Sequence, residues 1–324
     1  MSLGPMWALT QTGPSRLRWS QVPPPAPEDL PDGEVLLRVL AGGICGSDLP
    51  FFQGHRSPVV APGTPGFPLH EIVGEVIASR YGPIGVGQTV VGWATGQNGL
   101  AEYVVSAGHS LHAVSPGLNP ARAILLQPLA CVLYAVEQIG EVSGKRVAVL
   151  GVGPIGALFT HVLKAMGAAT VIGVDRVDRS DVREVLGIDE FVHADANTWA
   201  ETLADTDRPN VIVEAIGHQV ETLTAAVQAA AYEGKVFYFG IPNDAVYPLP
   251  MTSLLRKNMT LISGVTALPA RRRALASAEE YLARFPELFD ACLAEPYKFS
   301  DAEAAFEAAV RPRTGQMKVT LASA

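Results

Sequence analysis

Hydrophobic residues in the middle of the chain change from strand-like runs to helix-like spacing. Residues 147–150 are apolar and rich in valine, which predicts a short buried strand. Residues 155–166 carry apolar side chains at i, i+3, i+4, i+7, i+8 and i+11, one face of a helix that stops at Gly167. Residues 171–174 predict a second buried strand. The segment therefore has the pattern of a strand–helix–strand unit.

The same alternation continues toward the C-terminus. It predicts strands over residues 210–216, 234–240 and 259–265, and a helix over residues 220–231. Strands that alternate with helices are typical of an α/β fold in which helices cover both faces of a parallel sheet. We therefore predict a doubly wound parallel sheet.

The chain on either side of this region follows other patterns. Before residue 130, short strands recur at turn-marked spacing, which predicts a β-rich domain. After residue 265 helices return, one of them opened by a capping box of Ser300 and Glu303. Residues 316–321 predict a strand that returns to the first domain. We expect two domains, residues 1–130 with 266–324, and residues 131–265.

Composition narrows the class of partner. The 324 residues carry a formal net charge of -8, which argues against a surface for nucleic acid or anionic membranes. The three cysteines are widely spaced and odd in number, so they form no disulfide framework. We find neither a secretory signal nor an uninterrupted membrane span. A cytoplasmic location is therefore expected.

A glycine-rich turn joins the first buried strand to the helix. It has the form G-x-G-x-x-G, with Gly151, Gly153 and Gly156 around Pro154 and Ile155. The first glycine permits the tight turn, the second lets a pyrophosphate approach the backbone, and the third lets the helix pack closely on the sheet. The helix N-terminus offers free N–H groups to the phosphates. The segment therefore predicts a dinucleotide site.

An acid ends the second strand. Asp175 would accept hydrogen bonds from the adenosine ribose hydroxyls, and its charge would repel a 2′-phosphate, so NAD is favoured over NADP. Arg176 and Arg179 follow closely and offer a 2′-phosphate two guanidinium groups. Their alternative interpretation is a solvated loop after a strand.

Three polar groups of the first domain form a candidate metal site. They are Cys45 with Ser47 and Asp48, the pair His70 and Glu71, and Gln127. Thiolate, imidazole and carboxylate are the ligands of a catalytic zinc, which has three protein ligands and an open fourth position. Each residue alone is more often structural. Together, upstream of a dinucleotide fold, they favour a zinc site.

Five segments resemble the medium-chain dehydrogenase/reductase superfamily, and within it the zinc-dependent alcohol, polyol and threonine dehydrogenases. They are GGICGSDL, PGFPLHEIVGEV, GLAEYVV, QPLACVLYAV and GVGPIG. The resemblance covers nearly the whole chain. It implies a GroES-like catalytic domain joined to a Rossmann cofactor domain.

The resemblance also implies roles for the polar groups. Cys45 and His70 would be zinc ligands, and Glu71 a direct or alternating ligand. Ser47 would exchange a proton with the substrate oxygen, and Asp48 would orient the His70 imidazole. Phe51, Phe52 and Trp93 would line the substrate pocket or would be ordinary core aromatics.

By the same resemblance, zinc would act as a Lewis acid that lowers the pKa of an alcohol, and hydride would pass from the carbinol carbon to the nicotinamide. The nicotinamide would lie near Gly240, Ile241 and Val265, at the carboxyl ends of the later strands. A small-molecule alcohol or ketone is the expected substrate.

The sequence departs from the family at several positions. Gln127 stands where relatives carry a glutamate or cysteine in the zinc shell, and a neutral amide is a poor ligand. Either zinc is bound more weakly, or Cys45, His70, Glu71 and water hold it. Pro50 replaces a histidine that passes the proton to solvent in many relatives. The four-cysteine lobe of a structural zinc is missing, so one zinc per chain at most is expected.

Three functions follow from these patterns. The leading hypothesis is a zinc-dependent oxidoreductase acting on a secondary alcohol of the polyol, sugar or cyclitol type with NAD. The alternatives are a zinc-free quinone or enoyl reductase of the same superfamily, and a catalytically inactive dinucleotide-binding sensor. The substrate and the physiological direction stay open. A homodimer or homotetramer is expected, with the edge strand over residues 259–265 pairing across a two-fold axis.

Overall fold

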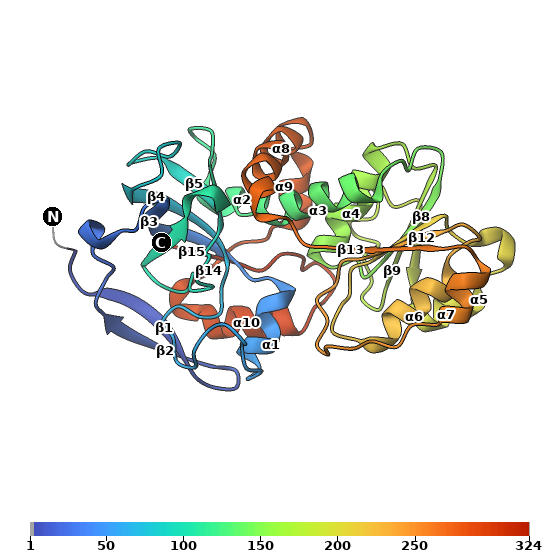
Figure 1. The fold of residues 1–324 in the computed structure, drawn as a ribbon, viewed down its shortest axis with the longest axis horizontal. Helices are drawn as coiled ribbons and strands as arrows, with labels where there is room; N and C mark the ends of the chain where they lie inside the picture. Colours follow the sequence, from blue (N-terminus) through green and yellow to red (C-terminus); the bar gives the residue numbers. More distant parts are fainter. Residues whose placement is uncertain (1–2, 324) are drawn as a thin grey trace. The chain divides into compact units, whose positions relative to one another are not determined.

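The computed structural model describes residues 3–323 and divides the chain into two compact units. Unit 1 contains Met1–Ala130, Ala267–Arg311 and Lys318–Ala324, and unit 2 contains Cys131–Thr266 and Pro312–Met317. Both are visible in Figure 1, unit 2 from green to orange. The sequence-based boundaries place residues 266 and 312–317 with the first domain, whereas the contacts place them in unit 2.

Unit 1 is built on a mostly antiparallel sheet. The strand order is β14 (Tyr297–Lys298), β15 (Thr320–Ala322), β3 (Glu34–Gly43), β4 (Glu71–Ser79), β5 (Thr89–Trp93) and β7 (Leu111–Ala113), with β6 (Tyr103–Ala107) paired to β3. A separate hairpin joins β1 (Met6–Gly13) to β2 (Arg16–Val22). The unit also contains α1 (Leu49–Phe52), α2 (Pro120–Ala123), α8 (Arg271–Arg284), α9 (Glu287–Cys292) and α10 (Ala302–Val310). This is the predicted β-rich domain.

The core of unit 1 gathers strand and helix residues from both ends of the chain. Val35, Leu37 and Val39 of β3 alternate inward, as the period of two in a strand requires. Phe306 of α10 packs on Phe52, with ring centroids 4.7 Å apart. Phe52 is therefore a core aromatic, as its alternative interpretation proposed.

The register of β3 and β4 places the polar groups of unit 1. Gly43 at the end of β3 lies opposite Glu71 at the start of β4, and Glu71 also lies opposite Trp93 of β5. Cys45 follows β3 by two residues and His70 precedes β4 by one. Residues distant in sequence therefore meet at one edge of the sheet.

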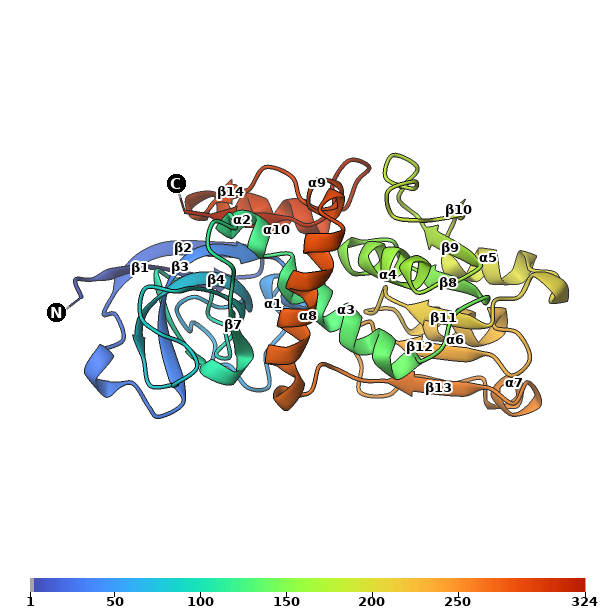
Figure 2. The same ribbon diagram turned by 90° about the horizontal axis from the view of Figure 1, so that it is seen from above.

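Unit 2 is a six-stranded parallel sheet. The order is β10 (Glu190–His193), β9 (Thr170–Asp175), β8 (Arg146–Leu150), β11 (Val211–Glu214), β12 (Lys235–Tyr238) and β13 (Thr260–Ser263). Helix α4 (Pro154–Ala165) covers one face, and α5 (Ala196–Thr202) and α6 (Val220–Ala229) cover the other, with α7 (Met251–Arg256) before the edge strand. Figures 1 and 2 show this layering, which confirms the predicted doubly wound fold.

Chain order reverses between β8 and β11, because β9 and β10 lie on one side of β8 and the later strands on the other. A ligand crevice forms outside the carboxyl ends of the strands at such a reversal. The turn that begins at Gly151 and the end of β11 at Glu214 both lie at this edge.

One local prediction is wrong. Helix α10 has no side-chain cap at Asp301, and Glu303 does not close a capping box. Its carboxylate instead accepts hydrogen bonds from Arg16 Nη1 at 2.7 Å and from the Leu17 backbone N–H at 3.0 Å. The Glu303 carboxylate therefore binds the β1–β2 hairpin instead of the backbone N–H groups at the start of α10.

Helix α3 (Leu126–Ile139) follows α2 after a short turn at residues 124–125. The combined stretch, Pro120–Ile139, is long and apolar enough to cross a membrane by length and composition alone. However, 67% of its most apolar window is buried inside the structure. That burial is what a core helix shows, so the length and composition of the stretch are weak evidence for a membrane span.

Candidate functional site

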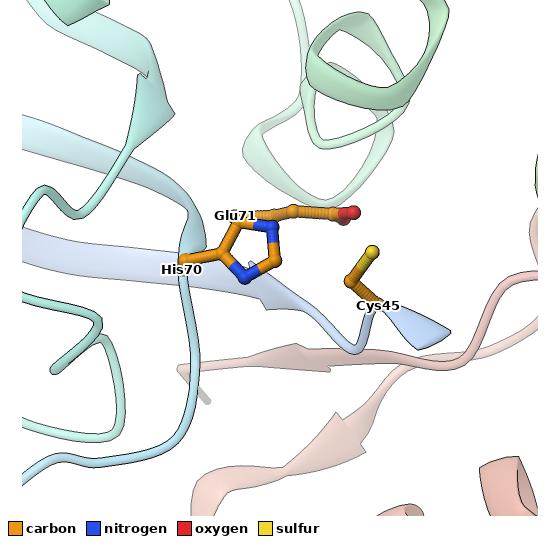
Figure 3. A group of neighbouring side chains, drawn as sticks. All are labelled: Cys45, His70 and Glu71. Carbon is orange, nitrogen blue, oxygen red and sulfur yellow. The ribbon is translucent and has the colours of Figure 1, made fainter. Parts of the chain in front are cut away.

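Three side chains of unit 1 converge as a metal site requires. One ligand atom from each of Cys45, His70 and Glu71 lies within 4.8 Å of the other two. Figure 3 shows the thiol, the imidazole and the carboxylate directed toward one another. Glu71 is buried, while Cys45 and His70 are half-buried, so two of the three side chains keep partial contact with solvent. The structure thus brings the three expected ligands together.

Asp48 connects two of these groups from a buried position. Its Oδ1 lies 2.7 Å from His70 Nδ1, and its Oδ2 accepts the Cys45 backbone N–H at 2.9 Å. Because Nδ1 is engaged, Nε2 is the His70 atom left for a metal. Burial lowers the pKa of His70, but the Asp48 carboxylate raises it more, so the net pKa is well above 6.5. Asp48 therefore holds both the ring and the Cys45 backbone.

Ser47 lies in the same short turn, Gly46–Asp48, and is half-buried beside Cys45. His55, which is close to Pro50 in sequence, is exposed. Its backbone N–H donates to the Pro50 carbonyl at 2.9 Å. The geometry of this loop therefore keeps Ser47 near the cluster and leaves the His55 ring at the surface.

A buried lysine faces the cluster, and the sequence analysis missed it. Lys318 Nζ lies 2.6 Å from Glu71 Oε2, with side-chain exposures of 2% and 1%. The ammonium also donates to the Ile44 carbonyl at 2.9 Å. Burial lowers the pKa of Lys318, but Glu71 and then Cys45 raise it, so the net pKa lies above its usual value. The pairing of β15 with β3, together with the bridge between Lys318 and Leu293, brings this residue to the site.

Gln127 lies on the other side of Glu71. With its amide oriented so that the oxygen accepts from Trp93 Nε1 at 2.6 Å, its nitrogen donates to Glu71 Oε1 at 3.2 Å. The Arg271 guanidinium covers the Trp93 ring, 4.5 Å from the centroid. The Gln127 side-chain oxygen therefore accepts the Trp93 indole N–H, and the Gln127 side-chain nitrogen holds Glu71.

The residues present fit a zinc ion. Sulfur, nitrogen and carboxylate oxygen are the donors of catalytic zinc sites. The Lys318 ammonium lies 2.6 Å from the buried Glu71 Oε2 and satisfies that oxygen as an ion-pair partner. A carboxylate has about four lone-pair sites, so Glu71 can also bind a cation.

The glycines of unit 2 have the expected geometry. Gly151 has a φ of 85°, which favours glycine, and a Cβ on Gly156 would lie 1.7 Å from the Gly151 carbonyl oxygen. Gly153 caps α4, and a Cβ there would meet nothing within 4 Å. Pro154 and Ile155 open the helix. The backbone at the N-terminus of α4 is therefore shaped for close approach by a phosphate.

Asp175 ends β9 beside this turn. Its Oδ2 accepts the Val152 N–H and its Oδ1 the Val177 N–H, both at 2.7 Å. Arg176 is exposed. Arg179 is 1% exposed and donates to the carbonyls of Arg313 at 2.9 Å and Gln316 at 2.7 Å. The Arg179 guanidinium is therefore bound to the segment Pro312–Met317. Of these two arginines, Arg176 is the one at the surface.

The carboxyl ends of the later strands are also close together. A Cβ on Gly240 would lie 2.2 Å from the Gly217 nitrogen, and the His218 N–H donates to the Ile241 carbonyl at 2.8 Å. Glu214, fully buried at the end of β11, accepts the Gly217 N–H at 3.0 Å, and burial raises its pKa. Val265 lies beyond β13 and is 74% exposed. Glu214 is a buried acid that the sequence analysis did not identify.

Comparisons with known proteins agree with this geometry. The model of the alcohol dehydrogenase GroES-like domain matches residues 31–116, and that of the zinc-binding dehydrogenases matches residues 154–279. Together the two matches cover more than half of the chain.

Individual proteins that are similar to this chain are also dehydrogenases. An L-idonate 5-dehydrogenase (NAD(P)(+)) of Escherichia coli is 28% identical over 70% of this chain and 75% of its own length. A sorbitol dehydrogenase of Halalkalibacterium halodurans is 26% identical over 81% and 84%. The structure of an alcohol dehydrogenase of Thermus sp. ATN1 superposes with a TM-score of 0.78 and 25% identity, covering 98% of this chain and all of that one. The chain belongs to the zinc-type medium-chain dehydrogenase/reductases, on the branch that contains the polyol dehydrogenases.

Proposed function

We propose that this protein is a zinc-dependent dehydrogenase that transfers a hydride between a secondary alcohol of the polyol, sugar or cyclitol type and NAD. The convergence of Cys45, His70 and Glu71 within 4.8 Å carries the proposal. The relatives named for idonate and sorbitol support the substrate class. No observation favours a zinc-free reductase or an inactive sensor.

The groups of unit 1 would bind one zinc and handle the substrate proton. When bound, zinc supplies Lewis acidity toward the alcohol oxygen. Cys45, His70 and Glu71 would hold the ion, and Asp48 keeps the His70 ring oriented by its 2.7 Å contact with Nδ1. Ser47, half-buried in the same turn, would exchange a proton with the substrate hydroxyl, taking up the substrate proton as its own hydroxyl proton passes to solvent.

The groups of unit 2 would hold the cofactor. The turn at Gly151, Gly153 and Gly156 would receive the pyrophosphate, and Gly240, Ile241 and Val265 would lie near the nicotinamide. The Asp175 carboxylate would accept the ribose hydroxyls and disfavour a 2′-phosphate. Since Arg179 is buried against other carbonyls, only Arg176 is left to offset that repulsion. We therefore propose NAD as the preferred cofactor.

A second copy of the chain is the proposed partner. Strand β13 is the edge of the parallel sheet, and Leu261 on it is exposed. An unpaired strand edge with apolar side chains is suited to pairing with the same strand of another copy. Light scattering of the purified protein would report the resulting dimer or tetramer.

The experiment combines metal content with activity. We expect one zinc per chain by elemental analysis. We also expect NADH formation from NAD with a panel of polyols, faster than NADPH formation from NADP. Cys45→Ser should lose both zinc and activity. Cys131→Ser, the same change in α3, is the matched control and should retain both. Wild-type protein that binds no zinc after added zinc would refute the proposal.

A further inference from the structure

Among the described residues 3–323, Lys318 is a charged group beside the metal cluster that neither the motifs nor the proposed reaction requires. It is 3% exposed, and burying an ammonium is costly unless it is paired. Its partners are the Ile44 carbonyl and Glu71 Oε2. Its direct contact with the cluster is therefore Glu71, while its charge also acts on the nearby Cys45 and Asp48.

The two oxygens of Glu71 are held unequally. Gln127 donates a neutral amide N–H to Oε1 at 3.2 Å, whereas Lys318 places a full charge 2.6 Å from Oε2. The carboxylate also lies against Gly43, where a Cβ would approach Oε2 to 2.3 Å. The Glu71 carboxylate is thus held more strongly by Lys318 than by Gln127. Movement of Glu71 toward a metal would stretch its ion pair with Lys318.

Charge counting shows what the lysine changes. Zinc with the thiolate of Cys45 and the carboxylates of Glu71 and Asp48 carries one negative charge, since His70 and Gln127 are neutral. The Lys318 ammonium cancels that charge and leaves the buried centre neutral. A positive group beside a cation weakens its binding and keeps the ion more strongly electrophilic.

We propose that Lys318 is a positioning residue that restrains Glu71 and thereby lowers the affinity of the site for zinc. The inference rests on the proposed zinc site. Without the ammonium, Glu71 is free to move fully onto the metal, so the loss of Lys318 should tighten zinc binding. A lysine that served only to stabilise the fold would give the opposite sign.

The test measures zinc affinity in Lys318→Met by competition with a chromophoric chelator. We expect zinc to be held at least about tenfold more tightly, the lower end of the effect of residues that contact metal ligands. The cobalt-substituted protein should show a changed visible spectrum, because Glu71 then binds the metal differently. Lys318→Arg keeps the charge and should behave as wild type.

Lys298→Met is the matched control, since it makes the same change at an exposed position in β14, which pairs with β15. It should alter neither the affinity nor the spectrum. If Lys318→Met does not fold, Lys318→Gln keeps a donor for the Ile44 carbonyl and should tighten zinc in the same direction.

The two levels of the proposal fail separately. Wild-type protein without a zinc site would refute the function, and the lysine proposal with it. Wild-type protein that binds one zinc, together with folded Lys318→Met or Lys318→Gln protein that binds it equally or more weakly, would refute only the role of Lys318.

Discussion

The Asp48→Asn variant tests how the zinc ligands are held in place. Asp48 uses both carboxylate oxygens as acceptors, one for His70 Nδ1 and one for the Cys45 backbone N–H. An asparagine of the same shape has one oxygen and one NH₂ group. The asparagine can accept a hydrogen bond from only one of the two N–H groups. The second N–H group then faces the asparagine NH₂ group and loses its hydrogen bond.

The size of the effect follows from the bond that is lost. A hydrogen bond to a charged group contributes about 1.5–3 kcal/mol. Since about 1.4 kcal/mol corresponds to a factor of ten, zinc affinity should fall by roughly 10–100-fold. Residues that orient metal-bound histidines give losses of the same order when they are replaced.

The pH dependence adds a second signature. The proton on His70 competes with zinc, and Asp48 keeps the pKa of His70 well above 6.5 against the opposing effect of burial. Zinc affinity of wild type should therefore rise with pH through that raised pKa. In Asp48→Asn the rise should move to lower pH, because the charge that favours the imidazolium is gone.

The assay is chelator competition across a pH series, with thermal unfolding to show that the variant is folded. Asp290→Asn is the matched control, because Asp290 pairs with Arg122 at the surface with a side-chain exposure of 85%. Such pairs contribute at most about 1 kcal/mol to stability, and zinc binding should not change. A folded Asp48→Asn protein with wild-type zinc affinity at every pH would refute the reasoning.

Two further predictions concern the cofactor turn and acid stability. Gly156→Ala should abolish NADH binding, measured by fluorescence titration, because the added Cβ would lie 1.7 Å from the Gly151 carbonyl oxygen. The same clash should lower the free energy of unfolding by about 1–3 kcal/mol. Full NADH binding by this variant would contradict the assignment of the turn. Burial raises the pKa of Glu279, but the Ser115 N–H and His112 lower it more, so the net pKa lies below 4.5. Its contribution to stability is present above the unfolded pKa and is lost as pH falls through the folded one. Glu279→Gln should therefore be less stable than wild type in urea near pH 7, and the difference should shrink below about pH 4.

Local patterns in the sequence predicted the cofactor unit well. The strand, turn and helix around Gly151 are set by apolar spacing and by backbone conformations that only glycine adopts easily. The observed α4 (Pro154–Ala165) begins and ends within one residue of the predicted helix. The cluster of Cys45, His70 and Glu71 was predictable because the ligands lie in short motifs at the ends of two neighbouring strands.

Long-range pairing explains what the sequence did not reveal. Lys318 reaches Glu71 because Thr320 of β15 pairs with Gly43 of β3. No local signal marks a buried lysine near the end of a chain. The failed capping box has a similar cause, since the acceptor of Glu303 is used by a hairpin from the other end of the sequence. Competition between local and distant partners is decided only in the folded structure.

Buried charged side chains gather in unit 1 near the end of β3 and the start of β4, and their burial has to be explained. Asp48, Glu71 and Lys318 are each at most 3% exposed and lie in one cluster. Buried ion pairs are weak stabilisers, because the cost of removing them from water cancels much of their attraction. Apolar residues would give the same sheet a more stable core. A divalent cation among these groups would explain the acidic residues, and the lysine balances the carboxylate that faces it. The cluster is therefore better explained by metal binding than by the stability of the fold.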